Sequence, residues 1–167
     1  LVTSGPGATN LVTGIATANY DSVPLVCFTG QVPLNLLGND AFQEIDIVGI
    51  TRNICKYAVT VRNREELPRI IKEAFYIART GRPGPVVVDL PKDIQQAMGT
   101  DEYPDTVSIR GYKPNEGVHM GQIKKAVSVL SKAKKPLFLI GGGVNIARAQ
   151  KEMTQLAETT GVPVITT

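Results

Sequence analysis

The sequence of 167 residues is poor in residue types that carry chemistry: it has no tryptophan, one histidine, two cysteines and 5% aromatic residues. It also lacks any run of about 18 apolar residues, so no transmembrane helix is expected, and no signal peptide is visible. Cys27 and Cys55 lie far apart and outside any CxxC spacing. We expect each to be a reduced interior residue of a cytoplasmic protein, not a nucleophile or metal ligand.

The same scarcity limits what side chains could do alone. The single histidine, His119, is expected at a helix start or on the surface, and no convincing Ser-His-Asp or Cys-His triad can be assembled. No group of His, Cys, Asp and Glu has metal-ligand spacing, so we expect no metal site in this chain. If the chain is part of an enzyme, a cofactor is expected to carry the chemistry.

The formal net charge is +3, and the basic residues are scattered along the chain. No aromatic residues interleave with them, so stacking on a nucleic acid has little support. We expect neither a nucleic acid nor a membrane as a partner.

Short apolar runs predict three buried strands, at Pro24–Gly30, Tyr57–Arg62 and Pro85–Pro91. Between the last two, Asn63 and Glu66 have the spacing of a capping box, and apolar residues then recur at helical spacing until Gly81. Strands that alternate with helices indicate an α/β fold with a mainly parallel sheet.

Other segments carry weaker signals. Residues 11–22 and the stretch from Ala41 to about Ile54 are expected to be helices, the second with Asp40 as a possible N-cap. Residues 99–118 are polar, rich in Gly and Pro and without periodicity, which predicts a linker. A second α/β pattern follows: a helix from Met120, a strand and glycine turn over Pro136–Gly143, a helix over Ile146–Ala157, and a final strand.

Both ends of the sequence lie inside apolar segments, and the first residue is not methionine. We therefore expect a piece of a longer protein that contains one domain or parts of two.

Two glycine turns are candidate binding loops. In TSGPGATN (3–10), Gly5 and Gly7 allow a sharp turn, and Thr3 and Asn10 could face one spot at the carboxyl end of a sheet. IGGGVN (140–145) resembles a nucleotide-binding turn but lacks the full G-x-G-x-x-G spacing. For both, a plain strand–helix turn stays open as the alternative.

Three further positions have both a plain and a functional interpretation. Arg82, in a rigid GRPGP turn, is either a solvated loop residue or a ligand for phosphate or flavin. Lys92 follows a strand end between Asp89 and Asp93, which a surface ion pair would also explain. Within DAFQE (40–44), Phe42 would ordinarily lie in the core and Gln43 in solvent.

Several motifs together resemble one family. TSGPGATN, FTGQVP, DAFQE, TGRPGP and VDLPKDIQ occur in the order and approximate spacing of the acetolactate (acetohydroxyacid) synthase catalytic subunits, which are thiamine-diphosphate enzymes. TSGPGATN alone is typical of thiamine-diphosphate enzymes broadly, whereas DAFQE with VDLPKD narrows the resemblance to the flavin-containing biosynthetic synthases. The resemblance covers essentially the whole chain.

The resemblance implies an α/β fold in two parts. Residues 1–98 would be the C-terminal half of a parallel-sheet pyrimidine-binding domain, and residues 99–118 a linker. Residues 119–167 would be the start of a Rossmann-like, FAD-associated central domain.

The resemblance also implies roles for individual residues. Thiamine diphosphate would be bound by Thr3, Gly5, Pro6, Gly7 and Asn10. Phe42 and Gln43 would border the reacting substrate, and the substrate channel would be lined by Pro33, Ala41 and Lys92. FAD would contact Arg82, Gly141, Gly142 and Gly143, with Thr166 and Thr167 as further candidates.

The activity implied is condensation of two pyruvates, or of pyruvate and 2-oxobutyrate, to acetolactate or acetohydroxybutyrate with release of CO2. The resemblance places the family's catalytic glutamate upstream of Leu1 and its Mg²⁺ ligands downstream of Thr167, so this chain alone is expected to be inactive. A homodimer or larger homo-oligomer and a small regulatory subunit are implied as partners. Alternatives are a pyruvate oxidase or glyoxylate carboligase, or a non-catalytic nucleotide-binding module.

Overall fold

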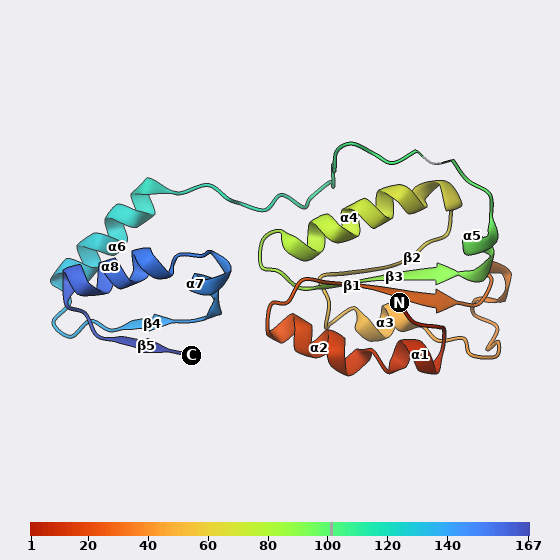
Figure 1. Cartoon of the computed structure of the whole chain (residues 1–167), viewed down its shortest axis with the longest axis horizontal. Helices are drawn as coiled ribbons and strands as arrows, with labels where there is room; N and C mark the ends of the chain where they lie inside the picture. Colours follow the sequence, from red (N-terminus) through yellow and green to blue (C-terminus); the bar gives the residue numbers. More distant parts are fainter. Residues whose placement is uncertain (101) are drawn as a thin grey trace. The chain divides into compact units, whose positions relative to one another are not determined.

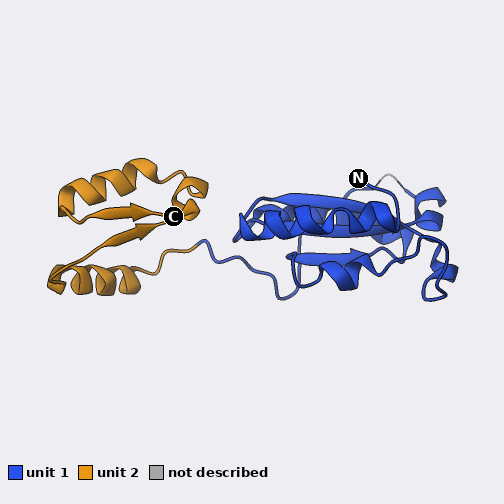
Figure 2. Ribbon diagram, turned by 90° about the horizontal axis from the view of Figure 1, so that it is seen from below, with its two compact units in different colours: residues 1–116 blue, residues 117–167 orange. Residues whose placement is uncertain are grey.

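The structure is a computed structural model that describes residues 1–100 and 102–167. The chain divides into two compact units, residues 1–116 and residues 117–167 (Figure 2). No helix among the described residues combines the length and apolar character needed to cross a membrane.

The first unit is built on a three-stranded sheet in the order β1 (Leu25–Gln31), β3 (Pro85–Pro91), β2 (Tyr57–Thr60). All pairs are parallel, and Val88 of the central strand lies opposite Phe28 and Val59. Val2 adds an isolated parallel bridge to β1 opposite Thr29. The three predicted strands are therefore confirmed, although the second ends at Thr60.

Helices cover both faces of this sheet (Figure 1). On one face lie α1 (Pro6–Thr9), α2 (Val12–Tyr20) and α3 (Ile47–Thr51); on the other lies α4 (Leu67–Arg79). Short elements complete the unit: η1 (Leu34–Leu36), η2 (Arg64–Glu66) and α5 (Lys92–Gln96). An uninterrupted valine run in β3 suits this position, since a central strand covered on both faces has no polar side.

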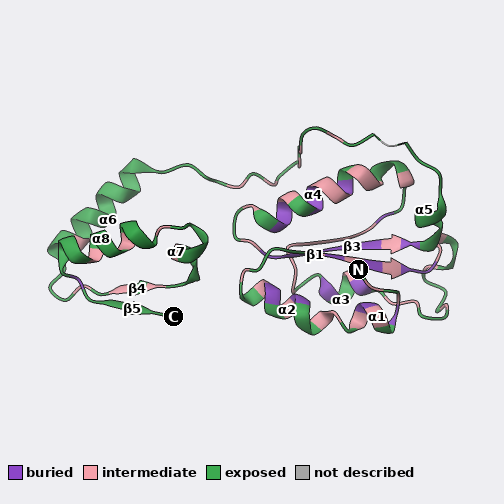
Figure 3. Ribbon diagram, in the orientation of Figure 1, coloured by how far each residue is buried: buried purple, intermediate pink, exposed green. Residues whose placement is uncertain are grey.

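The core lies around β3, whose residues are buried along most of the strand (Figure 3). Val86 and Val88 pack in one buried cluster with Ile70 and Ile77 of α4. Val87 points the other way and packs with Ile15 of α2. One strand therefore supplies both halves of the core, as its period of two requires.

The helix predicted over Ala41–Ile54 is largely wrong. Only Ile47–Thr51 is helical, and its N-cap is Asp46, whose carboxylate accepts from the Gly49 N–H at 2.8 Å. Residues ahead of it form an irregular loop in which Asp40 and Gln43 have φ of 52° and 61°. Left-handed residues cannot continue a right-handed helix, so the N-cap predicted at Asp40 is also wrong.

The entry to α4 differs from the predicted capping box. Asn63 does cap a turn, the 3₁₀ helix η2, by accepting from the Glu65 N–H at 3.0 Å. The Glu66 carboxylate instead accepts from Arg69 at 3.0 Å. The Glu66 carboxylate, which would bond the backbone in a capping box, pairs here with the Arg69 guanidinium three residues later.

The residues directly before Gly117, which were expected to form a linker, belong to the first unit. Ile109 and Tyr112 pack against the cluster beneath α4. Lys56 donates to the Tyr112 hydroxyl and to the carbonyls of Ile77 and Thr80 at the end of α4. Side-chain contacts thus hold this segment against the first unit, although its sequence has no periodicity. The predicted domain boundaries stay a prediction.

The second unit contains α6 (Met120–Lys132), β4 (Phe138–Ile140), α7 (Gly142–Ile146), α8 (Gln150–Thr160) and β5 (Val164–Thr166). β4 and β5 are parallel. His119 N-caps α6 through its ring Nδ1, which accepts from the Gln122 N–H, so its predicted helix-start position is confirmed. The helix expected over Ile146–Ala157 is broken, because Arg148 adopts φ 55° between α7 and α8.

Candidate functional site

A cavity of about 450 Å³ lies at the carboxyl ends of β1 and β3 in the first unit. Its lining comes from the chain start, the two strand ends and the first residues after β3: Leu1, Val2, Thr3, Ser4, Thr29, Gly30, Gln31, Leu90, Lys92 and Gln95. The carboxyl edge of a parallel sheet is where open α/β folds bind ligands, so this cavity is the candidate site.

The TSGPGATN turn is shaped by close backbone contacts. Gly5 has φ 56°, and a Cβ placed on it would lie 2.9 Å from the carbonyl oxygen of Gln43. A Cβ on Gly7 would lie 2.7 Å from the methyl carbon of Thr3. The backbone therefore requires a glycine at position 5, whereas the atom closest to Gly7 belongs to the Thr3 side chain. The turn also brings two motifs distant in the sequence, TSGPGATN and DAFQE, into contact.

The other residues of this turn that were predicted to bind the cofactor are exposed to solvent. Pro6 is the first residue of α1 and is exposed, as is Asn10, which ends the same short helix. Thr3 is also exposed, although it lines the cavity. Their binding roles stay predictions.

The DAFQE loop is held by its own glutamate. The Glu44 carboxylate accepts from the backbone N–H groups of Gly38 and Ala41. These N–H groups, chiefly that of Gly38, hold the pKa of the Glu44 carboxyl below its ordinary value. Phe42 protrudes from the loop with 89% of its surface exposed, so the plain expectation of a core phenylalanine is wrong. An exposed aromatic ring beside the site is available to a bound molecule.

Lys92 is exposed and lines the cavity, and no ion pair joins it to another described residue. Asp89 is buried and bonded to other side chains. Asp93 accepts from the Leu34 N–H at 3.1 Å. The surface ion pair that the sequence allowed is thus not formed, and the Lys92 amine stays available at the cavity.

A buried polar cluster beneath the cavity was not foreseen. Asp89 is 1% exposed and accepts from the hydroxyls of Thr29, at 2.7 Å, and Thr60, at 3.1 Å, and from the side-chain amide of Gln31, at 3.2 Å. The signal in the sequence was an aspartate directly after three buried valines, inside the strand and not beyond it.

The Asp89 cluster predicts a pH effect on stability. Burial raises the pKa of Asp89, and the three donors oppose this rise only in part. Since the folded pKa lies above the ordinary 3.8, the stability linked to the neutral carboxyl is fully present below that value and is lost as pH rises through the folded pKa. In urea unfolding, the free energy of unfolding of Asp89→Asn should therefore rise relative to that of the parent as the pH increases from 3.8 through the folded pKa of Asp89. A difference in unfolding free energy between Asp89→Asn and the parent that stays the same at every pH would contradict this prediction.

Arg82 binds the end of a neighbouring helix. Its Nε donates to the Ser22 hydroxyl at 2.8 Å, and its Nη2 donates to the carbonyls of Asn19 and Tyr20 at 3.1 and 3.0 Å. A guanidinium at a helix C-terminus satisfies carbonyls that lack partners within the helix. Arg82 and the glycine turn Gly141–Gly143 lie in different units.

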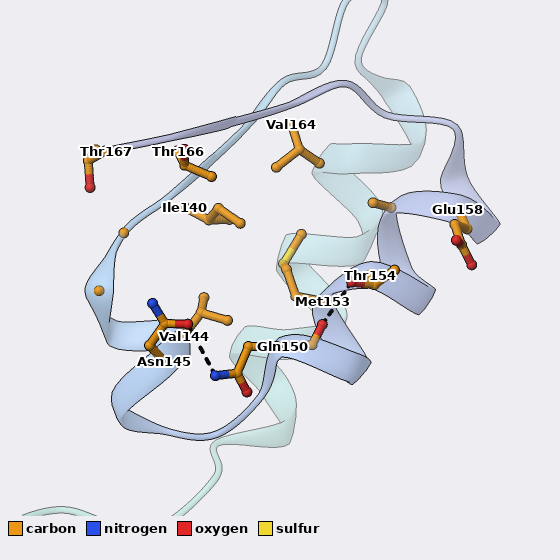
Figure 4. A pocket seen from close by; sticks show the side chains of 13 residues that line it. Ile140, Val144, Asn145, Gln150, Met153, Thr154, Glu158, Val164, Thr166 and Thr167 are labelled. Carbon is orange, nitrogen blue, oxygen red and sulfur yellow. Dashed lines mark hydrogen bonds between the residues drawn. The ribbon is translucent and has the colours of Figure 1, made fainter.

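The second unit contains a cavity of about 430 Å³ between its glycine turn and α8 (Figure 4). Gly141, Gly142, Thr166 and Thr167 line it, whereas Gly143 is not among the lining residues. A Cβ on Gly141 would lie 3.1 Å from the Thr167 hydroxyl, so the turn and the end of the chain approach closely. The lining combines these amide and hydroxyl groups with apolar side chains such as Val144 and Met153. Such a lining is compatible with part of a nucleotide or a flavin.

The cysteines and acidic residues offer no separate centre. Cys27 is buried, as expected, whereas Cys55 is only half-buried. Burial raises the pKa of both thiols, which favours their protonated form. Within residues 1–100 and 102–167, no three His, Cys, Asp or Glu side chains are grouped so that they could hold a metal ion.

Family models of thiamine pyrophosphate enzymes match two separate stretches of the chain. Residues 1–50 match the N-terminal TPP binding domain of thiamine pyrophosphate enzymes, and residues 123–167 match their central domain. The chain is 52% identical over 167 residues to an acetolactate synthase large subunit of Corynebacterium glutamicum, covering 100% of this chain and 27% of that protein. It is 50% identical over 167 residues to the isozyme 3 large subunit of Escherichia coli, covering 99% of this chain and 29% of that protein.

The chain thus spans less than a third of the length of these relatives. The similarity extends over both units. The chain belongs to the thiamine pyrophosphate enzymes, as a segment of their N-terminal and central domains that is closely similar to acetolactate synthase large subunits.

Proposed function

We propose that this chain is part of an acetolactate synthase catalytic subunit, which condenses two pyruvates, or pyruvate and 2-oxobutyrate, with release of CO2. The observation that carries the proposal is the contact between the two motif loops: the Gly5 turn accommodates the Gln43 carbonyl with no room for a side chain. This contact supports a single site shared by the thiamine-type turn and the synthase-type DAFQE loop, near the cavity that Lys92 lines.

Thiamine diphosphate would supply the electron sink that decarboxylation of a 2-oxo acid requires. In this chain Thr3, Pro6 and Asn10 would bind its pyrimidine end. Gly5 and Gly7 fit that role because they leave the backbone bare at a tight turn. Mg²⁺ would be held by residues outside this chain.

The loop and the lysine would act on the substrate. Phe42 and Gln43 would border it, and the exposed ring of Phe42 would exclude water from one side. The Lys92 ammonium, with Pro33 and Ala41 near it in the channel, would attract the carboxylate of a 2-oxo acid and so favour its entry.

FAD would occupy the second unit's cavity, with Gly141 and Gly142 against the dinucleotide and Thr166 and Thr167 beside it. Gly143, in the same turn, would also contact FAD, and the contact of Arg82 with FAD stays a separate proposal. We further propose a cytoplasmic enzyme that is at least a homodimer. Relatives named as large subunits support a small regulatory subunit as its partner.

The proposal is tested by a chimera in which this segment replaces the matching part of the Corynebacterium glutamicum large subunit. Assayed with thiamine diphosphate, Mg²⁺ and FAD, the chimera is expected to form acetolactate from pyruvate. The 167-residue chain alone is expected to form none, because the resemblance places the catalytic glutamate and the metal ligands outside it.

Two outcomes would contradict the proposal. The first is a folded chimera that binds thiamine diphosphate but makes no acetolactate, or that instead oxidises pyruvate or condenses glyoxylate. The second is measurable acetolactate from the 167-residue chain. A matched chimera with Lys92→Ala serves as the control for substrate entry, and its KM for pyruvate should rise by about tenfold or more, as loss of one charge-assisted contact requires.

A further inference from the structure

We propose that Asp89 is a positioning residue for this reaction: acting through Gln31, it fixes the segment 38–46 that carries Phe42 and Gln43. The expected effect on catalysis rests on the proposed function. Its structural part concerns only contacts inside the first unit. Among the described residues, no hydrogen bond joins the side chain of Asp89 or Gln31 to the predicted cofactor turn at 3–10.

The first step is the direction of the hydrogen bonds at Asp89. The hydroxyls of Thr29 and Thr60 and the side-chain amide of Gln31 all donate to the carboxyl oxygens of Asp89. An amide nitrogen can only donate, so Gln31 needs an acceptor at this place. A neutral amide oxygen at the same place could accept from Gln31 as well. The essential property of residue 89 is therefore an acceptor oxygen that faces Gln31.

The second step is the orientation of the Gln31 amide, which is 6% exposed. Its Nε2 donates to Asp89 Oδ2 at 3.2 Å and to the carbonyl of Ile45 at 2.7 Å, and its Oε1 accepts from the Val32 N–H at 2.9 Å. Both Nε2 hydrogens are thus used. If the amide turned over, its oxygen would face two acceptors, so the acceptor at Asp89 selects the orientation that bonds Ile45.

The third step is the loop itself. Ile45 directly follows the DAFQE motif, and the left-handed residues Asp40 and Gln43 persist only where their surroundings hold them. Glu44 supplies one anchor through the N–H groups of Gly38 and Ala41. Gln31 supplies the other, and it joins the loop to the sheet.

The fourth step connects the loop to the site. The Gln43 carbonyl lies so close to Gly5 that a Cβ there would be 2.9 Å away. A loop released at Ile45 would therefore shift Phe42 and Gln43 relative to the turn at Thr3–Asn10. Misplacement by about 1 Å can lower a rate by about 100-fold, so a buried carboxylate can influence chemistry that it never contacts.

The test compares four variants. Asp89→Ala and Gln31→Met break the connection to Ile45, whereas Asp89→Asn keeps an acceptor. Thr60→Val is the matched control, since it removes one bond to the same carboxylate without involving the loop. The readouts are amide hydrogen exchange in the 167-residue chain, urea unfolding, and kcat and KM for pyruvate in the chimera.

We expect Asp89→Ala and Gln31→Met to speed exchange in residues 38–46 by about tenfold or more relative to α4. In the chimera their kcat should fall by about tenfold or more with KM changed less than about threefold. Asp89→Asn and Thr60→Val should stay within about twofold of the parent in both loop exchange and kcat.

Exchange in 38–46 that rises no more than exchange in α4, or a Thr60→Val effect equal to that of Gln31→Met, would overturn the proposal. If Asp89→Ala does not fold, Gln31→Met decides the question, because it retains the carboxylate. A parent chimera without acetolactate synthesis would defeat the proposed function, and the exchange data would still decide whether Asp89 anchors the loop.

Discussion

Replacement of Gly5 by alanine is expected to lower the free energy of unfolding of the chain by about 2–4 kcal/mol. A non-glycine residue at φ 56° is strained. Its Cβ would also lie 2.9 Å from the Gln43 carbonyl and 3.0 Å from the Gln43 Cα, which are backbone atoms that cannot rotate away. In the chimera the same change should lower kcat, because the DAFQE loop must move to make room.

Gly38→Ala is the matched control for this prediction. Gly38 also has positive φ, at 82°, but a Cβ there would meet nothing within 4 Å. Only the backbone strain remains, so the loss should be about 1 kcal/mol. Urea unfolding of both variants separates the close contact from the conformational cost. Equal losses would show that the contact between Gly5 and Gln43 carries no energetic weight.

Replacement of Lys56 by methionine is expected to cost about 2–3 kcal/mol. The Lys56 ammonium donates to the carbonyls of Ile77 and Thr80, which end α4, and to the hydroxyl of Tyr112, at 3.1 Å. Hydrogen bonds from a charged donor are the stronger kind, and methionine keeps the aliphatic stem while it removes all three. The carbonyls at the helix end would then lose this donor.

The same variant should release the segment that precedes Gly117. Limited trypsin digestion after Arg110 is expected to be faster in Lys56→Met than in the parent, because Tyr112 loses its charged partner. Lys72→Met is the control: it removes a bond to the Pro104 carbonyl and a contact with the Tyr103 ring earlier in the segment. Cleavage after Arg110 should change less in this control, and equal acceleration would contradict the role given to Lys56.

The strands and α4 could be predicted because their signals are local. The run Pro85–Pro91 is apolar except at Asp89, and a strand with both faces covered accounts for such a run. Residues on α4 repeat at helical spacing, and Asn63 marks the entry. These patterns depend on the burial of one segment and not on the identity of its neighbours.

The DAFQE loop could not be predicted in the same way. Its composition permits a helix, and Asp40 is an acceptable N-cap. The outcome depends on Glu44 accepting from Gly38 and Ala41, and on Gln31 holding Ile45 from a strand far away in the sequence. Propensity over a short window contains neither contact, so the tertiary bonds override it.

The sequence by itself therefore determined the α/β class, the order of strands and helices, and the motifs that the chain shares with thiamine pyrophosphate enzymes. Hydrophobic periodicity and short motifs are properties of neighbouring residues, and they can be recognised without a structure. Only the tertiary structure decided that Asp89 lies buried beneath the site, that Lys92 is unpaired among the described residues, and that Gly5 meets Gln43. These are distances between remote segments, and they exist only once the sheet has brought its carboxyl ends together.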